Sequence, residues 1–159
     1  MKRLSILTGF TAIFSVILSG CAGVSPTPAF YLLDSPGPGR AASHLPDTFS
    51  IGIGPVALPA HLDRTEIIFR NGDNGVSIME LHRWAAPLDR QVSEALVAHL
   101  TTLLGTPKVT AFPWDRARRP GFRVDLTILT FDKIGDRAVM DAIWKIRNIK
   151  NDTILITQG

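Results

Sequence analysis

The chain has 159 residues, which is enough for one domain and argues against a two-domain enzyme. Hydrophobic residues make up 45% of it and charged residues 19%, a composition that excludes a disordered chain. A single cysteine excludes internal disulfides and multi-cysteine zinc sites. The formal net charge of +3 points, at first sight, to an anionic partner.

The first twenty residues predict a secretory signal peptide. Lys2 and Arg3 are their only charges, and the mostly apolar run 4–20 that follows is short for a membrane-spanning helix. Removing these two from the 17 basic residues leaves 15 against 14 acidic ones. The basic excess therefore belongs largely to the signal segment, and we expect no nucleic-acid partner.

The signal segment ends in Leu18-Ser19-Gly20-Cys21, which resembles the bacterial lipobox. In such signals the Cys thiol is joined to diacylglycerol, the peptidase cuts before the Cys, and the new amino group is acylated, commonly with palmitate. We expect this covalent lipid on Cys21, where it would give a durable membrane anchor. The alternative is a buried cysteine that ends an N-terminal anchor helix. By resemblance to known sorting rules, Ala22 suits the outer membrane.

The expected organisation is a signal peptide over 1–20, a tether over 21–28 and a single domain over 29–159. Small residues and two prolines favour an extended spacer in the tether. Apolar and β-branched runs then predict strands at 29–34, 48–58, 66–70, 76–79 and 109–114.

Two glycine-rich places in these strands call for an interpretation. Residues 52–57 fit a loose G-x-G-x-x-A nucleotide pattern, but Pro55 opposes the helix that this pattern requires, so a bend or bulge is favoured. Residues 71–75 (NGDNG) tolerate positive φ and predict a hairpin turn between the strands on either side.

One helix is predicted between Pro87, in its first turn, and Gly105, at its C-terminal cap. Apolar residues at three- and four-residue steps form its stripe, with His99 at the edge. The stripe consists of Leu88, Val92, Ala95, Leu96, His99, Leu100 and Leu103.

Three further strands follow, at 122–131, 138–146 and 153–157, joined by short turns. The first two alternate cleanly, with Phe122, Val124, Leu126 and Ile128 on one face and the even-numbered residues 138–146 on one face. This pattern predicts an antiparallel meander.

The expected fold is α+β, with an antiparallel sheet of five or more strands and one clear helix on a face. One helix covers only part of such a sheet, and the sequence ends shortly after a strand. We therefore expect either that a C-terminal covering helix is missing or that a partner supplies the cover.

The sequence resembles the PqiC/YmbA family, the ABC-type transport auxiliary lipoproteins. Two blocks are fairly specific: P-x-x-L-P followed by L-D-R, over residues 55–64, and W-A-x-P-L, over residues 84–88. The residues that carry the resemblance are Phe30–Leu33, Ile51–Val56, Leu58–Pro59, Leu62–Arg64, Trp84–Leu88, Leu103–Gly105, Phe112–Trp114, the strand 122–131 and Trp144.

The resemblance implies a lipoprotein on the periplasmic face of the outer membrane. It would act with an inner-membrane complex and an MCE-type periplasmic protein in moving lipids between membranes, as a homo-oligomer and without catalysis. Family members usually continue into a helix rich in Ala and Leu. We expect protein contacts from two segments, with turn formation or core packing as the alternative, above all for Trp84 and Leu88. The candidate residues are Leu58, Pro59, Leu62, Asp63, Arg64, Trp84, Pro87 and Leu88.

Two other classes of protein compete with this interpretation. One is a structural envelope lipoprotein that binds peptidoglycan or another envelope protein. The other is a periplasmic hydrolase, which the sequence disfavours because it contains no G-x-S-x-G, H-E-x-x-H or Ser-x-x-Lys motif. The four histidines are scattered, at 44, 61, 82 and 99, so we expect no metal site, no enzyme activity and no cofactor besides the lipid on Cys21.

Overall fold

A computed structural model describes residues 26–33, 46, 48–71 and 74–159 of the chain. The signal segment and Cys21 lie outside the described residues, as does most of the loop after the first strand. The elements, in chain order, are β1 (Ala29–Tyr31), β2 (Ile51–Ala57), β3 (Glu66–Asn71), β4 (Gly75–Trp84), α2 (Leu88–Leu104), β5 (Val109–Ala111), the 3-10 turn η1 (Arg116–Arg118), β6 (Phe122–Ile134), β7 (Arg137–Asn148) and β8 (Thr153–Gln158).

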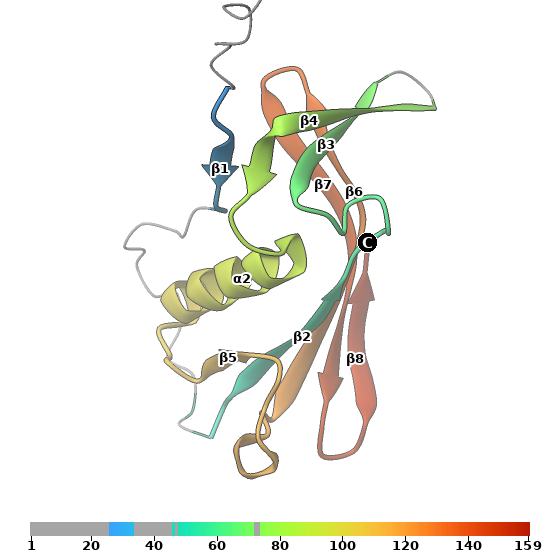
Figure 1. The fold of residues 1–159 in the computed structure, drawn as a ribbon. Coiled ribbons are helices and arrows are strands. Elements are labelled where there is room, and N and C mark those ends of the chain that lie inside the picture. Colours follow the sequence, from blue (N-terminus) through green and yellow to red (C-terminus); the bar gives the residue numbers. More distant parts are fainter. Residues whose placement is uncertain (1–25, 34–45, 47, 72–73) are drawn as a thin grey trace, which may run out of the picture.

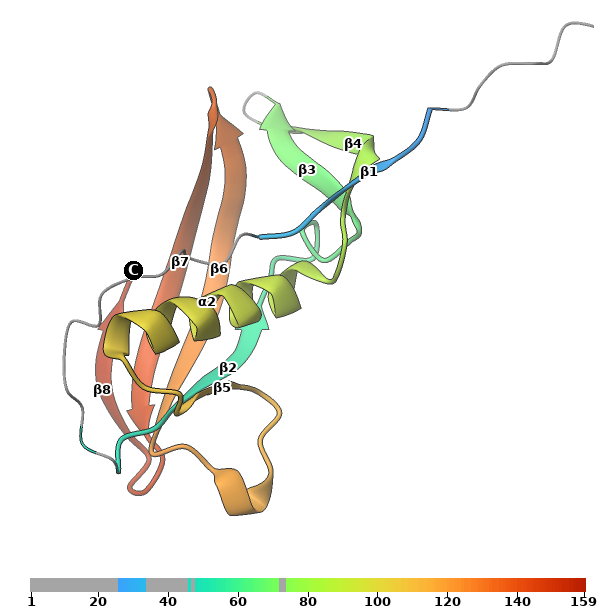
Figure 2. The same cartoon turned by 90° about the vertical axis from the view of Figure 1, so that its left-hand side faces the viewer.

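The strands form two sheets, and α2 lies across one face of the larger one (Figures 1 and 2). The larger sheet has five strands in the order β5-β2-β6-β7-β8, and the smaller has three in the order β1-β4-β3. The predicted α+β class, with one helix on a five-stranded sheet, is confirmed. In the described part of the chain, no helix combines the length and the hydropathy needed to cross a membrane.

Strand pairing differs in part from the expected all-antiparallel sheet. The predicted hairpin (β3–β4) and meander (β6-β7-β8) are antiparallel, but β2 runs parallel to both β5 and β6, and β1 runs parallel to β4. Strands joined by tight turns must be antiparallel, whereas β2 reaches its neighbours through long connections that include α2 and can bring a strand back in the same direction.

The main core lies between α2 and the centre of the five-stranded sheet. Leu88 and Val92 of the helix pack on Leu126 and Ile128 of β6, which lie on the predicted face of that strand. The helix stripe is shifted from the predicted one, because Leu103 is 53% exposed and His99 is also exposed. Gly105 caps the helix in the left-handed conformation, as predicted, with φ 63°.

The β6–β7 hairpin is longer than the sequence pattern predicted and extends past α2 to the smaller sheet (Figure 1). A register shift lies between Ile128 and Thr130, so one extra residue of β6 faces β7 there. Since this shift resets the alternation of faces, Phe131 lies on the side of the core, against which it packs.

The edge strand β8 is exposed along its whole length, including Ile154, Leu155 and Ile156. The expectation that a further helix or a partner covers this side of the sheet stays a prediction.

Candidate functional site

The loop between β2 and β3 contributes both buried and exposed residues. Leu62 is 5% exposed and belongs to the main core, and Leu58 packs against the same cluster. Asp63 and Arg64 are exposed, and Pro59 is half-buried. Core packing, the alternative considered for this loop, therefore accounts for Leu62, while Asp63 and Arg64 stay candidates for protein contact.

The second predicted segment, at the start of α2, divides in the same way. Leu88 is 2% exposed in the core, and Trp84 is half-buried against it, whereas Pro87 is exposed. Pro87 stands at the N-cap position rather than inside the first helical turn. Core packing, the alternative to protein contact, therefore accounts for Leu88, and Pro87 stays a candidate for protein contact.

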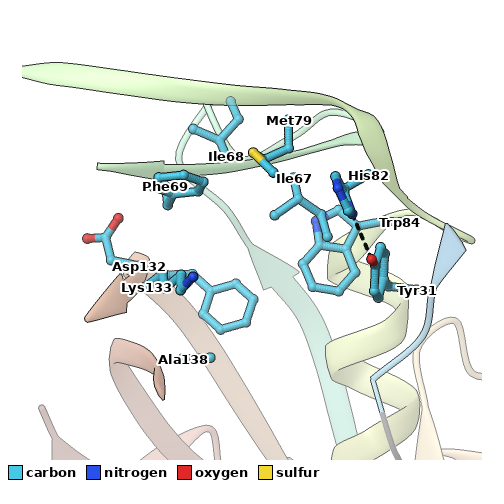
Figure 3. Close-up of a pocket in the computed structure, with 11 residues that line it drawn as sticks. Tyr31, Ile67, Ile68, Phe69, Met79, His82, Trp84, Asp132, Lys133 and Ala138 are labelled. Carbon is cyan, nitrogen blue, oxygen red and sulfur yellow. Dashed lines mark hydrogen bonds between the residues drawn. The ribbon is translucent and has the colours of Figure 1, made fainter. Parts of the chain in front are cut away.

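A pocket of about 350 Å³ lies between the smaller sheet and the far half of the β6–β7 hairpin (Figure 3). Of the predicted site residues, only Trp84 lines it. The wall is mostly aromatic and aliphatic and is formed by Tyr31, Ile67, Ile68, Phe69, Met79, His82, Trp84, Phe131, Asp132, Lys133 and Ala138.

One wall of the pocket depends on how β1 is held. β1 pairs with β4 so that Tyr31 lies opposite Trp84, and the Leu33 amide donates to Oε1 of Gln91 at 2.8 Å. Gln91 is buried at 4% exposure, and its Nε2 donates to the Ala86 carbonyl at 2.7 Å. This side chain therefore fixes the end of β1 to the start of α2.

Two aromatic pairs shape the interior. Tyr31 stacks on His82 with ring centroids 5.6 Å apart, and the Tyr31 hydroxyl is hydrogen-bonded to Nδ1 of His82 at 2.6 Å (Figure 3). Trp84 stacks on Phe131 at 6.0 Å with an interplanar angle of 18°. Both rings of the second pair also pack on the main core, so they form the boundary between the pocket and that core.

Charge is confined to one side of the pocket. Nε of Arg70 on β3 lies 3.2 Å from Oδ2 of Asp132 on β6, an ion pair that joins the two sheets. Lys133 follows Asp132, is exposed, and lies opposite Ala138 in the hairpin. Among the described residues it has no ion-pair partner.

A second charged pair lies outside the pocket, between the predicted contact loop and β3. Nε of Arg64 lies 3.0 Å from Oε2 of Glu66. The hydrogen bond from the Arg64 guanidinium holds the pKa of the Glu66 carboxyl below its usual range.

Sequence reasoning missed the pocket because its residues come from five strands, each of which has an ordinary apolar pattern. The Phe69 and Met79 positions resemble any hairpin residue that faces a core. The one available signal was that a single helix covers only part of the predicted sheet, which leaves apolar side chains for another element to cover.

Other features of the described residues give weaker sites. A hollow of about 530 Å³ lies beside the start of α2, with three charged side chains of the helix on one wall and residues of β2 and of the segment 111–113 on the other; the charged residues are Asp89, Arg90 and Glu94. Within residues 26–33, 46, 48–71 and 74–159, no group of three His, Cys, Asp or Glu side chains has the arrangement to hold a metal ion. The aromatic pocket is therefore the candidate functional site.

The family model described as "ABC-type transport auxiliary lipoprotein component" matches residues 31–159, which include the five-stranded sheet, the helix, β3, β4 and every residue that lines the pocket. The chain belongs to this family. The resemblance seen in the sequence is thus confirmed, and membership of a lipoprotein family implies a membrane-anchored place in the cell envelope.

Two solved structures share the fold. A crystal structure of an uncharacterized protein is 22% identical, with a TM-score of 0.64, and the match covers 84% of this chain and 76% of the other. A protein from Xanthomonas campestris is 12% identical, with a TM-score of 0.61, over 83% of this chain and 72% of the other. Comparison with curated proteins found no match.

Proposed function

We propose that this protein is a lipoprotein anchored in the outer membrane, on its periplasmic face, that serves as the auxiliary component of a Pqi/MCE-type system for lipid transport between membranes. It binds and positions other components and has no catalytic role. The observation that carries the proposal is the family match over nearly the whole folded domain.

The lipobox supports the proposed lipid anchor in the membrane. Leu18-Ser19-Gly20-Cys21 stands directly before the tether, and the chain holds no other cysteine. Lipid at this position would leave the folded domain on the periplasmic side, where an MCE-type partner would meet it.

Labelling with radioactive palmitate in cells tests the anchor. The wild-type chain is expected to incorporate label and to sediment with outer-membrane fractions, and Cys21→Ala is expected to lose the label because the acceptor thiol is absent. Label retained by Cys21→Ala would refute lipidation at this residue, and sedimentation with the inner membrane would refute the location.

Affinity capture from crosslinked cells tests the partner. The wild-type protein should recover an MCE-type periplasmic protein, and Asp63→Arg, which reverses a charge in the exposed contact loop, should reduce that recovery. Asp115→Arg, an equal charge reversal on an exposed loop elsewhere, is the matched control. Recovery of peptidoglycan or of a structural envelope protein instead would favour the structural lipoprotein.

A further inference from the structure

We propose that the aromatic pocket between the two sheets binds one acyl chain of a phospholipid, with Lys133 beside its phosphate. The choice of a phospholipid as the ligand rests on the proposed function, and the acyl-chain chemistry rests on the pocket itself.

The first argument is size and lining. A pocket of about 350 Å³ lies within the range of roughly 300–1,000 Å³ that is common for small-molecule sites. Its walls bring together the rings of Phe69, Trp84 and Phe131 with the thioether of Met79 (Figure 3). Aromatic rings supply large apolar surfaces, and a thioether adapts its shape to a flexible hydrocarbon.

The second argument concerns the polar groups of the wall. Tyr31 and His82 are hydrogen-bonded to each other, and Asp132 is paired with Arg70. These three groups are engaged within the protein, and apart from Lys133 and the indole N–H of Trp84 the rest of the lining is aliphatic, aromatic or thioether. A peptide inserted here would bring backbone N–H and C=O groups that need partners, whereas a hydrocarbon chain brings none.

The third argument is the position of the remaining charge. Lys133 lines the same pocket, is exposed, and has no ion pair among the described residues. An ammonium group at the rim of an apolar pocket matches an amphiphile with an anionic head and an apolar tail, because a lysine forms charge-assisted hydrogen bonds with phosphate oxygens.

The fourth argument is the direction in which the pocket lies. The N-terminal end of β1, the C-terminal end of β3 and the β6–β7 turn all lie toward the same end of the molecule in both views (Figures 1 and 2). The residues that line the pocket come from these strands and from β4. The chain ahead of β1 leads back to Cys21. A lipid anchor there would hold this end of the domain toward the membrane.

Photo-crosslinking of the full-length protein in cells labelled with radioactive phosphate tests the inference. Phe69 is replaced by photoreactive benzoyl-phenylalanine, and Phe30 is the matched control, since it is 64% exposed on β1 at the same end of the molecule without lining the pocket. Ultraviolet light is expected to attach phosphate label to the protein from position 69 and not from position 30. The protein's own anchor carries no phosphate, so the label reports phospholipid.

The rim charge has its own test in the same assay. With the photoreactive group at position 69, Lys133→Gln is expected to lower the labelled yield about tenfold, the equivalent of one hydrogen bond to a charged group, while Lys133→Arg retains the yield. Lys145→Gln, at an exposed position of β7 outside the pocket, is the control and should retain it too.

Three outcomes would overturn the inference: equal labelling from positions 30 and 69, crosslinks from position 69 to protein alone, or an adduct that consists of the protein's own phosphate-free acyl chain.

Capture of the MCE-type partner is measured on the same variants. If the partner is recovered while position 69 yields no phosphate label, the acyl-chain site is wrong and the proposed function stands. If position 69 is labelled and no partner is recovered, the lipid site stands and the transport assignment fails.

Discussion

At the residue scale, Gly52 explains a pattern that could be mistaken for a nucleotide motif. A Cβ on Gly52 would overlap the Trp114 ring and Pro120, and one on Gly54 would press against Asp125. Gly52 makes room for the segment after β5, and Gly54 makes room for side chains of β6. β2 remains a strand through Ala57, so no helix N-terminus follows them.

Replacing Gly52 tests this close packing. Gly52→Ala is expected to lower the free energy of unfolding by about 1–3 kcal/mol, because the added methyl group forces Trp114 or the strand to shift. Urea denaturation measures the change. Gly121→Ala is the control, since the nearest atom to its Cβ, Oγ of Ser50, is 3.6 Å away, an ordinary contact. Equal losses for both variants would contradict the explanation.

The Arg64–Glu66 pair predicts a dependence of stability on pH. The folded-state pKa of Glu66 is lowered by the hydrogen bond from Arg64. The pair therefore stabilises the fold above the unfolded-state pKa, and this contribution is lost as the pH falls through the folded-state pKa. The melting temperature of the wild type should exceed that of Glu66→Gln slightly at neutral pH, and the two should converge in acid.

Thermal unfolding of the double variant supplies the control. In an Arg64→Gln background the largest cause of the lowered Glu66 pKa is gone, so the pH-dependent effect of Glu66→Gln on the melting temperature should shrink. A difference that persists there undiminished would assign the effect to another group.

At the scale of elements, α2 packs on the five-stranded sheet along its length, from Leu88 at its start to Leu104 at its end. Leu88 and Val92 are buried at its start, and Gln91, also buried, secures the first strand of the smaller sheet. The helix therefore packs on one sheet and positions the other. The apolar pattern alone could not show this, because the link depends on a polar residue within the stripe.

Truncating two leucines of this helix tests which of them contributes to the core. Leu88→Ala is expected to cost about 2–5 kcal/mol of unfolding free energy, the usual cost of a cavity in a core. Leu103→Ala, on the same helix but 53% exposed, is expected to change it by less than about 0.5 kcal/mol. Chemical denaturation of the free protein decides; an unchanged Leu88→Ala protein would show that Leu88 is not a core residue.

Strand and helix positions were predictable where alternation or a cap was strong. The β6–β7 faces, the β3–β4 hairpin and the Gly105 cap follow from local chemistry. The parallel pairing of β2 with β6 could not be predicted in this way, because the residues of a strand do not indicate which other strand it pairs with. The register shift near Leu129 could not be predicted from the sequence either. It places Phe131 on the core face of β6, whereas simple alternation would place this residue on the opposite face.

The candidate site was less predictable than the fold. For Trp84 the sequence predicts protein contact, with core packing as the alternative, and the structure places it in the pocket wall next to the core. Tyr31 and His82 are separated by 51 positions and meet because β1 and β4 pair in parallel. Such a meeting depends on tertiary structure, which the pattern of each strand does not contain.

At the scale of the whole molecule, burial is uneven between the two sheets. In the smaller sheet only Ile68 is buried, whereas β2 is buried at five of its seven positions. The side-chain links between the smaller sheet and the rest of the protein include the Arg70–Asp132 pair, the hydrogen bond to Gln91 and the aromatic rings of the pocket.

Hydrogen exchange should reveal this difference. Backbone amides of β3 and β4 are expected to exchange faster than those of β2 and the centre of β6, because regions with few buried contacts open at lower free energy. Mass spectrometry on peptides from each strand measures the rates. Uniform protection across both sheets would contradict the expectation.

The short stretch of chain before β1 has a consequence for how tightly the pocket must hold its ligand. Pro26, the first described residue, follows Cys21 by five positions, which reach at most about 18 Å when fully extended. With Cys21 lipidated as proposed, the domain stays beside a dense layer of candidate ligands. The high effective concentration at that surface makes a weak, rapidly exchanging site sufficient. Release onward would then cost little, which suits a component that passes its cargo on.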